Sequence, residues 1–166
     1  FAGPSLFARE ENDIALGAKV ADACAHIDFV MPMGSSQDVP GTAAEVHEIP
    51  AMFANTTKPA AFIGYSPLGC EYVYEMAAVI AGGQDKLREK PFLILYPEAI
   101  APLFFPDDVV DRILIAADRF MPQLPGSTVS AGATGPVTLA GMLVQITAEA
   151  LVHITIAQLR KTGCPV

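Results

Sequence analysis

Short apolar segments alternate four times with helical segments along this chain, and this alternation limits the fold more than any other feature. The run 91–96 is apolar without alternation, as expected of a parallel strand covered on both faces. The strand–helix order predicts an α/β fold with a parallel sheet, either doubly wound or part of a barrel. The predicted pairs are 27–31 with 42–55, 59–64 with 68–81, 91–96 with 107–120, and 121–130 with 136–161.

Other segments extend this pattern. A helix over 10–24 precedes the first strand, a helical turn occupies 84–89, and a fifth strand begins at 163. The fourth strand should be irregular, because Pro122, Pro125 and Gly126 interrupt it. We interpret residues 1–166 as one domain, or as part of a larger one.

The loops after the predicted strands are the expected place for chemistry in either architecture. Glu98 stands out there as the only carboxylate in an apolar, proline-bounded loop after the strand 91–96. Tyr65 and Tyr96 end neighbouring strands, so their rings could lie near Glu98. Aromatic faces together with a carboxylate suit a quaternary ammonium ion, which offers no N–H donors. Alternatively, Glu98 caps a neighbouring helix or pairs with an arginine outside this chain.

The fourth loop contains small residues and leads into the longest predicted helix. Pro136 suits the first helical position, with Gly135 or Thr134 as N-cap. The backbone N–H groups of 132–137 would then face outward at the positive end of a helix and favour an anion. The alternative is a turn whose small residues only allow close packing.

The helix 136–161 has few polar residues, and they are nearly aligned. Thr138, Gln145, Glu149, His153 and Arg160 fall within about 80° of one another at 100° per residue. So narrow a polar stripe predicts that most of the helix surface is buried. The polar residues also argue against a membrane span. His153 lies one turn after Glu149, which is typical of an exposed or mutually satisfied pair.

The composition narrows the possible partners. Hydrophobic residues make up 52% of the chain and charged residues 17%. This is more apolar surface than one small domain usually hides, so we expect a homo-oligomer or a piece of a larger fold, and the apolar terminus favours the piece. With 18 acidic and 10 basic residues, and no larger basic cluster than 86–90, nucleic acid is an unsuitable partner. Three widely spaced cysteines indicate neither a disulfide framework nor a metal site, and fit a reducing cytoplasm.

Several stretches together resemble the trimethylamine methyltransferase family, over essentially the whole chain but about a third of the family's usual length. The resemblance implies a (β/α)8 barrel, of which this chain would cover about four βα units. It also implies transfer of a methyl group from a small methylated amine to the cobalt of a corrinoid carried by a partner protein. The stretches are 23–32 (ACAHIDFVMP), 55–59 (NTTKP), 75–83 (EMAAVIAGG), 88–96 (REKPFLILY) and, most distinctive, 131–145 (AGATGPVTLAGMLVQ).

The family divides by the use of pyrrolysine, which serves tertiary amines, whereas relatives without it include enzymes for quaternary amines such as glycine betaine. All residues here are standard, which favours the non-pyrrolysine branch. In this reading Glu98, Tyr65 and Tyr96 hold the cation, and Gly132, Ala133 and Thr134 line the mouth of the site. No catalytic dyad or triad can be assembled, so the catalytic residues remain open. The alternative is a catalytically silent barrel piece that only assembles with other chains.

Overall fold

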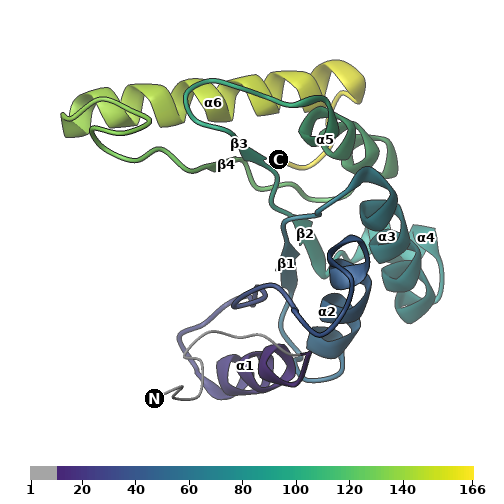
Figure 1. Ribbon diagram of the computed structural model, residues 1–166. Coiled ribbons are helices and arrows are strands. Elements are labelled where there is room, and N and C mark those ends of the chain that lie inside the picture. The colour runs from purple at the N-terminus through teal and green to yellow at the C-terminus, as the bar shows by residue number, and fades with distance from the viewer. Residues whose placement is uncertain (1–10) are drawn as a thin grey trace, which may run out of the picture. The chain divides into compact units, whose positions relative to one another are not determined.

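The computed structural model describes residues 11–166, which form two compact units (Figure 1). The first unit ends at Ile94 and the second comprises Leu95–Val166. Both combine helices with very short strands, and the parallel pairing predicted from the sequence is present in each. The described chain is therefore α/β, with small parallel sheets.

The described part of the first unit contains four α-helices, the strand β1 and the first two residues of the strand β2. Its elements are α1 (Glu11–Ala23), a 3-10 turn (Gly41–Ala43), α2 (Ala44–Phe53), β1 (Ala60–Phe62), α3 (Pro67–Ala81), α4 (Gln84–Glu89) and β2 (Leu93–Leu95), whose last residue opens the second unit. These agree closely with the predicted helices, although Glu10, the predicted start of the first helix, lies outside the described residues. The predicted strand 27–31 is reduced to one parallel bridge between Val30 and Ala60.

Local signals explain the bounds of α3. The Ser66 hydroxyl accepts a hydrogen bond from the Gly69 amide, and Pro67 occupies the first helical position. At the other end Gly82 adopts the left-handed conformation with φ of 84°, which glycine reaches without steric cost. Val73, Tyr74 and Ala77 are buried along the inner face of the helix. The Tyr74 ring packs edge-on against Phe62 of β1, with ring centroids 5.7 Å apart.

The second unit holds two helices and two further strands. These are β3 (Glu98–Ala99), α5 (Asp107–Arg119), β4 (Gly126–Ser127) and α6 (Leu139–Arg160). β3 and β4 pair in parallel, with Glu98 opposite Gly126 and Ala99 opposite Ser127. A second parallel bridge joins Leu95 to Gln123. The fourth strand is thus interrupted, as its prolines predicted.

Helices α5 and α6 pack together around a small apolar core. Val109, Ile113 and Ala117 of α5 meet Ala157 of α6, and Cys164 lies buried in the same cluster. At the surface, the guanidinium of Arg160 donates to both carboxylate oxygens of Asp118, at 2.8 and 2.7 Å. This apolar contact and ion pair fix the carboxyl-terminal half of α6 against α5.

The predicted start of the long helix is wrong. α6 begins at Leu139, and the side chain of its N-cap, Thr138, accepts from the Gly141 amide. Residues 130–135 instead form a closed turn, in which the amides of Ala133, Thr134 and Gly135 donate to the Ser130 carbonyl and that of Gly132 donates to the Gly135 carbonyl. These N–H groups are used within the turn, so they do not form the outward-facing anion site expected at a helix N-terminus.

The burial predicted for this helix is also reversed. Gln145, Glu149 and His153 lie on the side that faces the rest of the second unit, and the last two are fully buried. Large apolar residues such as Leu139, Val144 and Leu159 are more than 70% exposed instead. Glu149 and His153, in the middle of the polar stripe, can be buried because groups outside α6 supply hydrogen-bond partners for them, whereas Thr138 and Arg160 at its ends are exposed. Among residues 11–166, α6 is also the one helix long and apolar enough to cross a membrane, and 11% of its apolar stretch is buried.

His153 does not form the predicted pair with Glu149. Its side chain is 1% exposed, and its Nε2 lies 3.0 Å from Oε1 of Gln123. Because the amide oxygen can only accept, the imidazole donates from Nε2. Burial lowers the pKa of His153 to about 4, so the ring is neutral at physiological pH.

This burial predicts an acid-sensitive stability. Between pH 6.5 and 4 the unfolded state takes up a proton on His153 that the folded state excludes, so the free energy of unfolding falls as the pH falls through this window. The expected loss is about 2 kcal/mol by pH 5. Thermal unfolding of the full-length protein between pH 7.5 and 4.5 should show a smaller pH dependence in His153→Gln than in the wild type.

The exposed His26 provides the matched control, since His26→Gln should keep the wild-type pH dependence. Equal pH dependence of the wild type and His153→Gln would contradict a neutral, buried His153.

Candidate functional site

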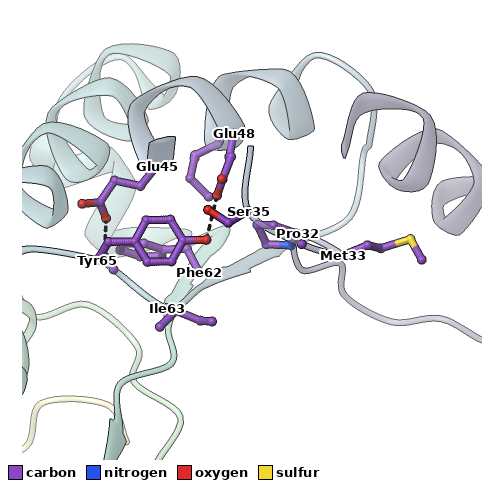
Figure 2. Close-up of a pocket in the computed structure, with 11 residues that line it drawn as sticks. Pro32, Met33, Ser35, Glu45, Glu48, Phe62, Ile63 and Tyr65 are labelled. Atoms are coloured by element: carbon purple, nitrogen blue, oxygen red, sulfur yellow. Dashed lines mark hydrogen bonds between the residues drawn. The ribbon is translucent and has the colours of Figure 1, made fainter. Parts of the chain in front are cut away.

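The first unit contains a pocket of about 310 Å³ between α2 and the loops that follow the Val30 bridge and β1. Figure 2 shows two carboxylates of α2 that meet Tyr65, a residue of the loop after β1: Glu45 at its backbone amide and Glu48 at its ring hydroxyl. The pocket therefore lies where the sequence places chemistry, at the carboxyl ends of parallel strands. Its lining residues are Pro32, Met33, Gly34, Ser35, Glu45, Glu48, Ile49, Phe62, Ile63, Gly64 and Tyr65.

Glu45 is buried and fastens the loop after β1 to α2. Its Oε2 accepts from the Tyr65 amide at 3.0 Å, and its Oε1 accepts from the amide and hydroxyl of Ser66, both at 3.2 Å. Gly69 makes this close approach possible, because a Cβ there would lie 1.7 Å from Glu45 Oε1. A buried carboxylate thus replaces strand pairing as the support of Tyr65.

Glu48, one helical turn later, holds the neighbouring loop and the Tyr65 ring. Its Oε1 accepts from the Ser36 amide at 2.7 Å, and its Oε2 accepts from the Tyr65 hydroxyl at 3.1 Å. Burial, followed by the negative charge of Glu48, raises the pKa of Tyr65 to about 12. Tyr65 therefore stays a neutral phenol that donates to Glu48, with 37% of its surface exposed at the pocket.

The charge and shape of this pocket suit a small cation. None of its eleven described lining residues is Lys, Arg or His, while two are glutamates. The oxygens of Glu48 already accept from Ser36 and Tyr65, so its negative charge acts on a ligand mainly at a distance. An aromatic face beside carboxylates attracts cations electrostatically even when the cation carries no N–H donor. Tyr65 thus has Glu45 and Glu48 as its carboxylate partners in the first unit, and its predicted association with Glu98 stays a prediction.

Tyr96 and Glu98 form a second cluster, in the second unit. Glu98 is the first residue of β3 and lies opposite Gly126, so it is part of a strand and does not lie in the predicted loop. A Cβ at Gly126 would lie 2.9 Å from both Glu98 Cγ and Tyr96 Cζ, which shows how closely the two side chains meet there. Burial, and then the Glu98 carboxylate, raises the pKa of Tyr96. The predicted neighbourhood of Tyr96 and Glu98 is thus confirmed.

Gly132, Ala133 and Thr134 form the tip of the turn 130–135 in the second unit. Gly132 and Ala133 are exposed and Thr134 is partly buried. The Thr134 hydroxyl accepts from the Ser130 amide at 2.9 Å, and its carbonyl accepts from the Gln145 side chain at 3.1 Å. The small side chains are therefore displayed on a turn with a fixed shape, and their place at the mouth of a substrate site stays a prediction.

The sequence analysis missed the carboxylates of α2. Glu45 and Glu48 have an i,i+3 spacing, which puts both on one face of an otherwise mainly apolar helix. That spacing beside the polar loop 32–38 is the signal that could have identified them. For metals, no group of three or more His, Cys, Asp or Glu side chains in the described part of the chain is arranged to hold an ion.

Comparison with known proteins gives the family of this chain. The sequence profile of the trimethylamine methyltransferase (MTTB) family matches residues 11–166. The chain belongs to this family. Its membership agrees with the resemblance carried by the stretches 23–32 and 131–145, both of which lie inside the matched region.

Individual members of the trimethylamine methyltransferase family show how much of a complete protein is present. Trimethylamine methyltransferase MttB of Desulfitobacterium hafniense is 35% identical over 156 residues, covering 93% of this chain and 31% of the relative. Glycine betaine methyltransferase of the same species is 32% identical, covering 81% of this chain and 28% of the relative. Trimethylamine methyltransferase MttB1 of Methanosarcina acetivorans is 34% identical, covering 94% of this chain and 32% of the relative. The chain thus spans about a third of the length of these relatives.

The close packing of Gly69 on Glu45 gives a prediction for this family member. Alanine in place of glycine inside a helix normally stabilises by about 1 kcal/mol. Gly69→Ala should instead lower the free energy of unfolding of the full-length protein by about 1–3 kcal/mol, because it displaces Glu45 from the Tyr65 and Ser66 amides. Chemical denaturation measures the change.

Gly17→Ala in α1 is the matched control, since its new Cβ would meet only the mobile end of the exposed Met33 side chain. Stabilisation by both substitutions would show that Glu45 does not support the loop after β1.

Proposed function

We propose that the full-length protein transfers a methyl group from a small methylated ammonium compound to the cobalt of a corrinoid bound to a partner protein. Membership of the trimethylamine methyltransferase family supports the reaction class. The names of the relatives, trimethylamine and glycine betaine methyltransferases, support methylated amines as substrates. The observation in this chain that carries the proposal is Tyr65, whose amide and hydroxyl donate to two buried carboxylates, in a pocket whose described lining has no basic residue.

The residues of the pocket would bind and orient the cation. A quaternary nitrogen leaves as a neutral amine once its methyl group is taken, so the protein need not supply a proton to it. Its task is to hold the methyl carbon in line with the attacking atom and to exclude water. The ring of Tyr65 supplies a face for the methyl groups, while Glu45 and Glu48 supply the negative charge. Tyr96 and Glu98 are proposed as a further cation-binding element.

The corrinoid would supply a strongly nucleophilic cobalt that accepts the methyl group. Because so large a macrocycle needs an approach free of bulky side chains, we assign Gly132, Ala133 and Thr134 to the mouth of the site. The turn that carries them is held by its own hydrogen bonds and by Gln145, so it can present a constant surface to a partner protein.

The fold proposed for the full-length protein is a (β/α)8 barrel. The parallel Val30–Ala60 and Leu95–Gln123 bridges and the β3–β4 pair support it, since each joins strands in the order that successive βα units require. The described elements would form about four of the eight units in a single barrel domain. We further propose the non-pyrrolysine branch, because all residues of the chain are standard, and a homo-oligomer in the cytoplasm.

The alternative for the 166-residue chain by itself is a catalytically silent piece that assembles with other protein. The exposed apolar residues of α6 support this reading for the isolated chain. This alternative predicts no turnover from residues 1–166 alone, whatever the full-length protein does.

Methylation of cob(I)alamin tests the proposed function. The full-length protein is mixed with reduced cobalamin and, in turn, glycine betaine, other quaternary amines and trimethylamine, and the absorbance change to methylcobalamin is followed. Transfer from a quaternary amine alone is the expected result and would place the protein in the non-pyrrolysine branch. Folded protein that transfers a methyl group from none of these amines would contradict the proposal.

Substitution of Tyr65 tests the pocket within the same assay. Tyr65→Ala should raise the KM for the amine about tenfold, or roughly 1.4 kcal/mol, which lies within the range for a cation on a desolvated aromatic face. Tyr65→Phe keeps the face and should stay within about threefold of the wild-type KM. Tyr72, an exposed tyrosine of α3, provides the control, since Tyr72→Ala should leave KM unchanged. An unchanged KM in Tyr65→Ala would remove this pocket from the substrate site.

A further inference from the structure

A buried glutamate of α6 connects three segments of the second unit. Glu149 is fully buried, and its Oε1 accepts from the Leu103 amide at 2.9 Å and from the Gln145 side chain at 3.1 Å. Its Oε2 accepts from the Ser127 hydroxyl. Gln145 in turn donates to the Thr134 carbonyl at 3.1 Å. One carboxylate therefore reaches the loop after β3, the strand β4 and, through Gln145, the turn 130–135.

The donors that surround Glu149 are all neutral. A buried carboxylate without a cationic donor is costly unless hydrogen bonds stabilise it. Despite burial, the pKa of Glu149 is lowered, because Ser127, Leu103 and Gln145 all donate to the charged form. An apolar side chain at this position would pack at less electrostatic cost than the carboxylate. The contribution of the Glu149 carboxylate is therefore the placement of the three segments.

The other hydrogen bonds of these segments are mostly local: Ile100 and Phe104 bond to each other on either side of Leu103, and the turn 130–135 is closed by its own amides. β3 and β4 comprise two residues each, so their backbone pairing provides few hydrogen bonds. Leu103 has a φ of 56°, a left-handed conformation that is unfavourable for a leucine. The amide of this residue donates the hydrogen bond to Glu149. Strain of this kind persists only where surrounding contacts hold it, and it often marks a functional segment.

We propose that Glu149 is a positioning residue that fixes the strand carrying Glu98 relative to the turn carrying Gly132, Ala133 and Thr134. It acts through Ser127, which lies opposite Ala99 in the β3–β4 pair, and through Gln145, which holds the turn. The role of Glu149 in the substrate site rests on the proposed function, in which Glu98 contacts the cation. Its effect on the two segments does not depend on that function.

Two substitutions at Glu149 separate its roles. Glu149→Leu keeps the volume but removes both acceptors. In Glu149→Gln the amide oxygen can still accept from Leu103 and Gln145, while the new NH₂ group donates to the Ser127 hydroxyl, which serves as donor or acceptor. The glutamine variant should therefore retain the arrangement that the leucine variant loses. Thr155→Val on the same helix is the control, because Thr155 is exposed and bonds only within α6.

Hydrogen exchange in the full-length protein provides the first measurement. Amides in 98–104 and 126–135 should exchange at least tenfold faster in Glu149→Leu, whereas Glu149→Gln and Thr155→Val should match the wild type. Peptides of α3 and β1 should remain unchanged in all variants. Unchanged exchange in Glu149→Leu, or equal acceleration throughout the protein, would overturn the proposal.

Methyl-transfer kinetics provide the second measurement. The KM for the amine should rise about tenfold in Glu149→Leu and stay within about threefold in Glu149→Gln. Local loosening with an unchanged KM would overturn a role for Glu149 in the substrate site. A wild-type protein that transfers no methyl group would contradict the proposed function instead, and the exchange data would still decide whether Glu149 positions the two segments.

Discussion

Hydrogen bonds from loop amides to buried glutamates are the interaction on which both units depend. Glu45 and Glu48 of α2 accept from the amides of Tyr65, Ser66 and Ser36, and Glu149 of α6 accepts from that of Leu103. The strands have only two or three residues, so their ladders can orient the following loops only weakly. Side chains from the helices take over that task. The geometry of the Tyr65 pocket in the first unit is consequently set by α2, and that of the loops in the second unit by α6, as much as by the sheets.

Helices with strong local signals could be predicted from the sequence. α3 and α5 lie within one residue of their predicted bounds, because Ser66, Pro67 and Gly82 act on the ends of their own helix and α5 has a clear apolar face. The start of α6 could not be predicted in this way. Gly135 and Pro136 resemble a helix start, but Gly135 lies against Val129 and Gln145 in a turn whose amides are already paired. The turn closes on its own amides and is held by Gln145, which lies ten residues after Gly135, and a start signal does not record that contact.

The candidate site shows the same division between local and tertiary information. The rule that loops follow the carboxyl ends of parallel strands led to Tyr65 and to the pair of Tyr96 with Glu98. Glu45 and Glu48 escaped attention because their partners lie 20 and 12 residues away. The polar stripe of α6 was recognised but assigned to the wrong side of the helix. Periodicity shows that a stripe exists, whereas its burial depends on hydrogen-bond partners in other segments, such as the donor Ser127 and the acceptor Gln123.

Under the proposed function, the protonation state of Tyr65 would have a chemical consequence for methyl transfer. A phenolate near a methylated ammonium ion would compete with the intended acceptor and could be alkylated itself. With its pKa raised to about 12, the hydroxyl of Tyr65 keeps its proton throughout the physiological pH range. A neutral phenol is a weak nucleophile. In the proposed reaction, burial of the ring and the Glu48 carboxylate would thus both keep Tyr65 from accepting the methyl group itself.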